Sequence, residues 1–195
     1  MEWSEIPRFS SWGKYTCDVT LNDLESNLKV YINEYGLDLN PDFQRSHVWT
    51  EKKRIEYVEY ILKGGRNSRH IIFNHPNWMS TFEGDMQLVD GKQRLESTRM
   101  FLNNELPVFN GIYRRDFTNN GKQIKRFSSE IFFTFYINNL PTRVELLQFY
   151  LDLNTGGVVH SDEEIERVKQ LLVKEQKKEN LREISSIIQE IGGYK

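Results

Sequence analysis

Residues 86–102 read MQLVDGKQRLESTRMFL and change character at the Asp90-Gly91 step. Met86 to Val89 has the composition of a short strand, and the aspartate-glycine pair that follows favours a tight turn. Beyond the turn, side chains at helical spacing form one face: Leu95, Thr98, Phe101 and Leu102. The sequence therefore predicts a strand, a turn and a helix in direct succession.

Strand and helix patterns also precede this segment. Lys14 to Val19 is predicted to be a strand, and Thr20 with Asp23 resembles a capping box that opens a helix closed by Gly36. Thr50 caps a second helix that ends at Gly64-Gly65, and a strand follows at His70 to Asn74. The two helices are expected to bury these residues: Leu21, Leu24, Leu28 and Tyr31 in the first, and Ile55, Val58, Ile61 and Leu62 in the second.

Downstream, Asn119-Asn120-Gly121 lies between two β-rich arms, Ile112 to Phe117 and Gln123 to Phe127, and predicts a hairpin. Phe132 to Asn138 is predicted to be another strand. Two helices are then expected to open at capping pairs, Thr142 with Glu145 and Ser161 with Glu164. Together these elements predict an α+β fold, a mixed β-sheet flanked by helices, with a helical C-terminal part.

The C-terminal tail follows a nearly all-polar segment, Lys174 to Asn180. Its apolar residues recur at helical spacing: Leu181, Ile184, Ile188 and Ile191. A lone amphipathic helix of this length is marginal in water, so the stripe is expected to dock on its own domain or on another chain. We favour an interaction element, with a second copy or a separate nuclease as the partner.

Composition narrows the class of protein. The chain has 195 residues with a formal net charge of −2, which argues against nonspecific wrapping of nucleic acid by a basic surface. Cys17 is the only cysteine, so an internal disulfide and a cysteine-based zinc site are excluded, and a reducing cytoplasm fits best. No secretory signal is visible, and no apolar run is long enough to cross a bilayer.

Asp90 to Arg94, DGKQR, is the strongest candidate for chemistry. A strand that ends at a glycine turn and feeds a helix presents free backbone N–H groups and the positive end of the helix dipole to an anion. Arg94 and Lys92 add positive charge, Gln93 is placed to position a water, and Asp90 is placed to hold a hydrated Mg²⁺ or to orient Arg94. Taken alone, the pattern also fits a plain β-turn before an exposed helix with routine ion pairs.

Two further loops are candidates. Leu39 to Trp49 contains Gln44 and Arg45, which we expect to contact a ligand, together with two aromatic residues that we expect to anchor the core, Phe43 and Trp49. The third element is Asn154-Thr155-Gly156-Gly157, whose Asn154, Gly156 and Gly157 would let the backbone approach a ligand closely. A simple connection between two helices would favour the same residues.

Taken in order, the three elements resemble the N-terminal domain family of GmrSD-type modification-dependent restriction endonucleases. That family shows a proline with a QR pair and a tryptophan, then a DGQQR block after a strand, then an asparagine-glycine loop before a glutamate-bearing helix. The matching residues, within about Thr16 to Lys169, are Pro41, Gln44, Arg45 and Trp49, then Asp90, Gly91, Gln93 and Arg94, then Asn154, Gly156, Gly157 and Glu164. The resemblance implies a fold similar to the ParB and sulfiredoxin group and a nucleotide-hydrolysis or sensing site.

Two departures limit what the resemblance implies. Lys92 stands where the family commonly has glutamine, which keeps an anion site but not a side-chain amide. Relatives that cut DNA typically carry a C-terminal HNH-type nuclease domain, and no such domain is expected within the residues up to Lys195. The histidines lack metal-ligand spacing and are expected to be structural or superficial: His47, His70, His75 and His160.

These observations predict a nucleotide-binding domain at residues 1–170 and a helical tail at 171–195. Catalytic roles are assigned to Asp90, Gln93 and Arg94, and nucleoside triphosphate (NTP) binding to residues of all three elements: Gln44, Arg45, Gly91, Lys92, Asn154, Gly156 and Gly157. Mg²⁺ is the expected cofactor. NTP hydrolysis, direct cleavage of DNA by the same pocket, and noncatalytic DNA binding beside a separate nuclease all remain open.

Overall fold

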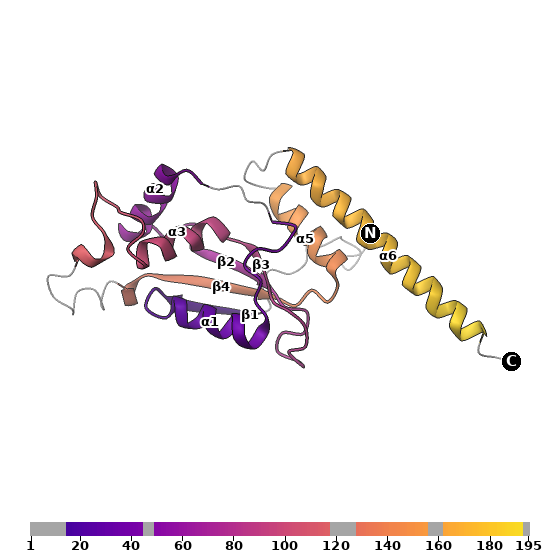
Figure 1. The fold of residues 1–195 in the computed structure, drawn as a ribbon. Helices are drawn as coiled ribbons and strands as arrows, with labels where there is room; N and C mark the ends of the chain where they lie inside the picture. Colours follow the sequence, from indigo (N-terminus) through magenta and orange to yellow (C-terminus); the bar gives the residue numbers. More distant parts are fainter. Residues whose placement is uncertain (1–14, 45–48, 118–127, 156–161, 193–195) are drawn as a thin grey trace, which may run out of the picture. The chain divides into compact units, whose positions relative to one another are not determined.

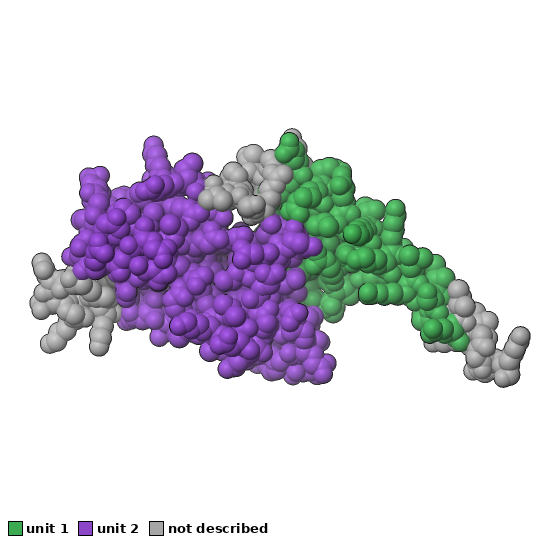
Figure 2. All heavy atoms as spheres, viewed as in Figure 1, with its two compact units in different colours: residues 1–10, 140–195 green, residues 11–139 purple. Residues whose placement is uncertain are grey.

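The computed structural model describes residues 15–44, 49–117, 128–155 and 162–192. The chain divides into two compact units, shown in different colours in Figure 2. We call residues 11–139 the sheet unit, and residues 1–10 with 140–195 the helical unit. Each unit is described separately.

A mixed β-sheet of four strands forms the sheet unit. Its strands are β1 (Tyr15–Thr20), β2 (His70–Asn74), β3 (Gln87–Asp90) and β4 (Phe132–Asn138). Their order is β1-β4-β2-β3, with β4 antiparallel to β1 and parallel to β2, and β3 antiparallel to β2 (Figure 1). The predicted α+β class, a mixed sheet flanked by helices, is confirmed.

The core of this unit is built on the alternation of β4. Phe133, Phe135 and Ile137 are buried, whereas Phe132 is 38% exposed, as expected for a strand with one face toward the core. The helices α1 (Leu24–Tyr35), α2 (Glu51–Leu62) and α3 (Lys92–Leu102) supply the other side of the same cluster. The apolar faces predicted for the three helices pack into or against it: Leu21, Leu24, Leu28 and Tyr31, then Ile55, Val58, Ile61 and Leu62, then Leu95, Phe101 and Leu102.

Helix ends follow the predicted capping residues in most places. Gly36 closes α1 in the left-handed conformation, with φ of 59°, as expected for a glycine after a helix. Thr50 caps α2, where its side-chain oxygen accepts a hydrogen bond from Lys53 N at 3.3 Å. At α1 the N-cap is Asp23 rather than Thr20, and the Thr20 hydroxyl donates to the Asp23 carboxylate at 2.7 Å.

The predicted strand at Ile112 to Phe117 is wrong. Residues Arg114–Phe117 form a 3₁₀ helix, because Asp116 holds a local turn: its N–H donates to Tyr113 O at 2.9 Å and its carboxylate accepts from Tyr113 N at 2.8 Å. Such local bonds compete with an extended strand, and β-propensity alone does not reveal them. The other parts of the predicted hairpin, Asn119 to Gly121 and Gln123 to Phe127, lie outside the described residues.

Two helices form the described part of the helical unit, α5 (Arg143–Thr155) and α6 (Asp162–Gly192). The capping box predicted for α5 is confirmed, because Thr142 N and the Glu145 carboxylate lie 3.2 Å apart and Glu145 N donates to the Thr142 hydroxyl at 3.2 Å. The Tyr150 hydroxyl lies 3.4 Å from Glu164 Oε1 and links the two helices. Ser161, expected to open α6, lies outside the described residues.

The tail continues α6 without a break. Lys174 to Asn180 is helical, and residue 171, where the tail was predicted to begin, lies within α6. Leu181 and Ile184 are 64% and 53% exposed, so this part of the apolar stripe faces solvent. The side chains of Ile188 and Ile191 lie outside the described residues. Docking of the stripe on another chain therefore stays a prediction.

Candidate functional site

The DGKQR element lies where β3 passes into α3. The register between β2 and β3 shifts from Phe73 opposite Leu88 to Ile72 opposite Asp90, so β3 contains one extra residue, Val89. A bulge of this kind re-aims the side chains next to it and is common beside functional sites. Asp90 is the last residue of β3, and only Gly91 separates it from α3.

Gly91 is required for the turn into α3. Its φ is 97°, in the left-handed region that glycine adopts without strain. A Cβ at this position would lie 2.5 Å from Ile71 Cδ1 and 3.2 Å from His70 O. Both the backbone conformation and the close approach of β2 therefore exclude larger residues.

We expect Gly91→Ala to lower the free energy of unfolding by more than the 1–3 kcal/mol, roughly, that an unfavourable φ costs alone, because a steric clash is added. Gly64→Ala is the matched control: its φ is 91°, and no described atom lies within 4 Å of an added Cβ. Chemical denaturation measures both variants. Equal losses would show that the contact with Ile71 has no energetic effect.

Arg94 and Asp90 form the central ion pair of the site. Arg94 Nη2 donates to Asp90 Oδ2 at 2.5 Å, one helical turn along the chain. The Arg94 side chain is 16% exposed and that of Asp90 34%, so the pair is only partly open to water. Arg94 Nε is buried without a hydrogen-bond partner among the described residues. The guanidinium is therefore held in place by one carboxylate and retains further donor capacity.

His70 also lies at this ion pair, where the sequence had indicated only a structural or surface role. Its Nε2 is 3.8 Å from Asp90 Oδ2. Burial lowers the pKa of the His70 imidazole and the Arg94 charge lowers it further, while Asp90 opposes both. The signal that could have located His70 is the pairing of β2 with β3, which brings residues twenty positions apart in sequence to one place.

Gln44 and Gln93 tether the Leu39–Trp49 loop to the site. Gln44 Nε2 donates to Leu88 O at 2.5 Å, and Gln93 Oε1 accepts from Trp49 N at 2.9 Å. The two aromatic residues of the loop anchor it as predicted: Phe43 is fully buried, and Trp49 packs edge-on against Tyr57 with ring centroids 5.3 Å apart. Each glutamine side chain thus makes one hydrogen bond to a backbone group, Gln44 to Leu88 O and Gln93 to Trp49 N.

Gln93→Leu is expected to leave the partly buried Trp49 N–H without a hydrogen-bond acceptor, because the change removes Gln93 Oε1. An unsatisfied buried donor costs about 1–3 kcal/mol, so hydrogen exchange of the Trp49 amide should accelerate by roughly 10-fold or more. Gln170→Leu, at an exposed position of α6, is the control. Unchanged exchange at Trp49 in the Gln93 variant would rule out the tethering role.

The first turn of α3 is unusual in its charges. Within the described residues no side chain caps this helix, and its first turn holds no acidic residue, whereas α1 and α2 have Glu25 and Glu51 there. Lys92 and Arg94 occupy the turn instead, although cations are unfavourable at the positive end of a helix dipole. The free N–H groups and the two cations together favour an anion at this point.

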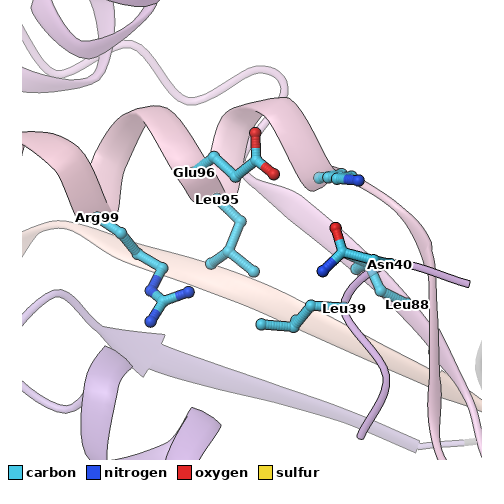
Figure 3. A pocket seen from close by; sticks show the side chains of 7 residues that line it. Leu39, Asn40, Leu88, Leu95, Glu96 and Arg99 are labelled. Carbon is cyan, nitrogen blue, oxygen red and sulfur yellow. The ribbon is translucent and has the colours of Figure 1, made fainter. Parts of the chain in front are cut away.

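A pocket of about 80 Å³ lies along one flank of α3 (Figure 3). Its apolar surface comes from Leu39, Leu88 and Leu95. The polar side chains that line it are Asn40, Lys92, Glu96 and Arg99. Lys92 thus belongs both to the pocket and to the first turn of α3.

The remaining predicted residues are placed as follows. Asn154 belongs to the helical unit, in the last turn of α5, where its side-chain amide donates to Tyr150 O at 2.6 Å. His75 is buried, and its Nδ1 accepts from Asn77 N at 3.3 Å. Several residues of interest lie outside the described residues: Arg45, His47, Gly156, Gly157 and His160. The ligand contact predicted for Arg45 therefore stays a prediction.

The side chains at Asp90 do not form a metal site by themselves. Among the described residues, no group of three or more His, Cys, Asp or Glu side chains gathers as metal ligands would. One oxygen of Asp90 already accepts from Arg94. Mg²⁺ commonly uses one or two carboxylates plus substrate phosphates, so Asp90 would fit only as a partner to phosphate oxygens.

Comparison with known proteins gives the family. The fold and site define an α+β domain with a cationic helix start beside a bulged strand. The family model described as "GmrSD restriction endonuclease, N-terminal domain" matches residues 22–192, and the chain belongs to this family, which links it to restriction endonuclease systems. No curated protein and no solved structure matches the chain. No helix in the described ranges is long and apolar enough to span a membrane.

Proposed function

We propose that the sheet unit binds the phosphates of a nucleoside triphosphate at the first turn of α3. The observation that carries this proposal is the combination found there: uncapped backbone donors, no acidic residue, and the two cations Lys92 and Arg94. Asp90 already pairs with Arg94, but Lys92 has no ion-pair partner among the described residues and lies at the positive end of the helix dipole, so a further anion would stabilise this arrangement. A triphosphate supplies that charge.

Each residue of the element has a distinct role in the proposal. Arg94 offers its guanidinium fork to phosphate oxygens, and Asp90 keeps the fork in position. Lys92 adds a point charge on the pocket side, and Gly91 supplies the left-handed turn that starts α3 directly after Asp90. Gln44 bonds to Leu88 O, and Gln93 accepts from Trp49 N. A contact of Arg45 with the phosphates is part of the proposal.

Hydrolysis of the terminal phosphate is the second part of the proposal. Charge on the transferring group is stabilised in such reactions mainly by fixed cations and backbone donors, which this site contains. Mg²⁺ would enter with the triphosphate and use Asp90 as its protein ligand. A role in DNA restriction, with DNA or a separate nuclease as partner, rests on family membership alone.

Isothermal titration with each of the four common ribonucleoside triphosphates tests binding, and release of inorganic phosphate tests hydrolysis. We expect saturable binding of at least one triphosphate, and slow release of phosphate in the presence of Mg²⁺. Binding of a triphosphate without release of phosphate would rule out hydrolysis and leave the protein as a nucleotide sensor. Failure to bind any triphosphate, with DNA bound or cut instead, would overturn the proposal in favour of a DNA-binding module or a nuclease.

A further inference from the structure

The pocket on the flank of α3 contains polar groups of two kinds. Arg99 is already committed, because its Nε and Nη2 donate to the two carboxylate oxygens of Glu25 at 2.6 and 3.1 Å. Lys92 and Asn40 make no side-chain hydrogen bond or ion pair with other described residues. The pocket thus combines a fixed guanidinium with an ammonium group and an amide that remain available.

Glu96 is the acidic group of the pocket. Its carboxylate lies 3.8 Å from Arg54 Nη2, an ion-pair distance that is too long for a hydrogen bond. Glu96 and Lys92 are four residues apart on α3, yet no ion pair forms between them in the structure. Figure 3 shows the Glu96 carboxylate and the Asn40 amide on either side of the same space, with leucine side chains below. Glu96 therefore keeps acceptor capacity toward the pocket.

The charges along α3 indicate which chemical group of a ligand fits at each position. Lys92 stands at the anion-favouring start of the helix, and Glu96 follows about 6 Å further along the axis. A phosphate beside Glu96 would be repelled, whereas a hydroxyl group would be a good donor to its carboxylate. A ligand that spans both positions needs an anionic end and, one turn away, hydroxyl groups.

We propose that this pocket holds the ribose of the nucleotide, with the Glu96 carboxylate accepting hydrogen bonds from the sugar hydroxyls. The inference rests on the proposed function, because it places the triphosphate at the start of α3. A volume of about 80 Å³ accommodates several water-sized groups, which suits a sugar ring and not a sugar together with its base. The leucine side chains would cover the apolar face of the ring.

Paired titrations test this assignment with three kinds of probe: each ribonucleoside triphosphate, its 2′-deoxy counterpart, and inorganic tripolyphosphate. The wild-type protein should bind the ribonucleotide on the order of 10- to 100-fold more tightly than the deoxynucleotide, as expected for loss of a charge-assisted hydrogen bond. Glu96→Ala should abolish this preference without weakening tripolyphosphate binding. The matched control, Glu56→Ala, removes an exposed carboxylate of α2 and should retain the preference.

The outcomes separate the two proposals. If neither tripolyphosphate nor any nucleotide binds, the proposed function fails and the ribose assignment fails with it. If nucleotides bind but ribose and deoxyribose forms bind equally well to the wild type, the pocket assignment is overturned while the proposed function stands. The wild-type comparison keeps this test valid even if Glu96→Ala does not fold.

Discussion

Arg94→Gln is expected to weaken nucleotide binding by about 10- to 100-fold while the sheet unit stays folded. The guanidinium is held at the start of α3 by Asp90 at 2.5 Å, so a ligand phosphate meets it in a fixed position. Charge-assisted hydrogen bonds of this kind contribute about 1.5–3 kcal/mol each. Asp90, left without its partner, is 34% exposed and can be hydrated. Titration calorimetry measures the loss, and circular dichroism confirms the fold.

Arg115→Gln is the matched control for this change. Arg115 lies over the Tyr113 ring at 4.7 Å, outside the α3 site. Its substitution removes the same positive charge from the protein as Arg94→Gln does. It should bind nucleotide as the wild type does. Equal affinities for the Arg94 variant and the wild type would assign the DGKQR element to a plain turn with a routine ion pair.

The largest effect on stability is expected for Phe135→Ala. Phe135 is fully buried on β4, between Cys17 of β1 and Ile71 of β2, and its ring lies 5.0 Å from that of Phe73 and 6.1 Å from that of Tyr31. Truncating a buried phenylalanine costs about 3–5 kcal/mol, from lost burial and from the cavity left behind. Urea denaturation measures the change.

Phe132→Ala on the same strand provides the comparison. Phe132 is 38% exposed, so its truncation should cost well under half as much as that of Phe135. Similar losses for the two variants would contradict the alternation of β4 that places the core on one side of the sheet.

The spacing of apolar residues in the sequence predicted those helices and strands that bury one regular face. Phe132 to Asn138 is β4 with the predicted bounds, and the face predicted for α3 is buried. These predictions succeeded because strand alternation and helical spacing reflect which side of an element meets the core. At Ile112 to Phe117 the same reasoning failed, because hydrogen bonds of Asp116 stabilise a 3₁₀ turn.

The site was predicted only in part, because its geometry depends on contacts between distant segments. The sequence indicated Gln44 and Gln93 as ligand-binding or catalytic groups, but it could not show that their amides also bond to Leu88 and Trp49. Nor could it place His70 beside Asp90, since that contact depends on the pairing of β2 with β3 and on the bulge between them. Glu96 was missed because a carboxylate on a helix surface has no local signature of a pocket.

The most direct test of nucleotide binding at α3 is a titration followed by amide chemical shifts in ¹⁵N-labelled protein, with a nonhydrolysable triphosphate as the ligand. We predict saturable shifts that are largest at the amides of Lys92, Gln93 and Arg94, which form the uncapped first turn. The amides of Glu25 and Glu51, in the first turns of α1 and α2, serve as internal controls and should shift little. Saturable binding with the largest shifts elsewhere, and none in the first turn of α3, would contradict the proposed site.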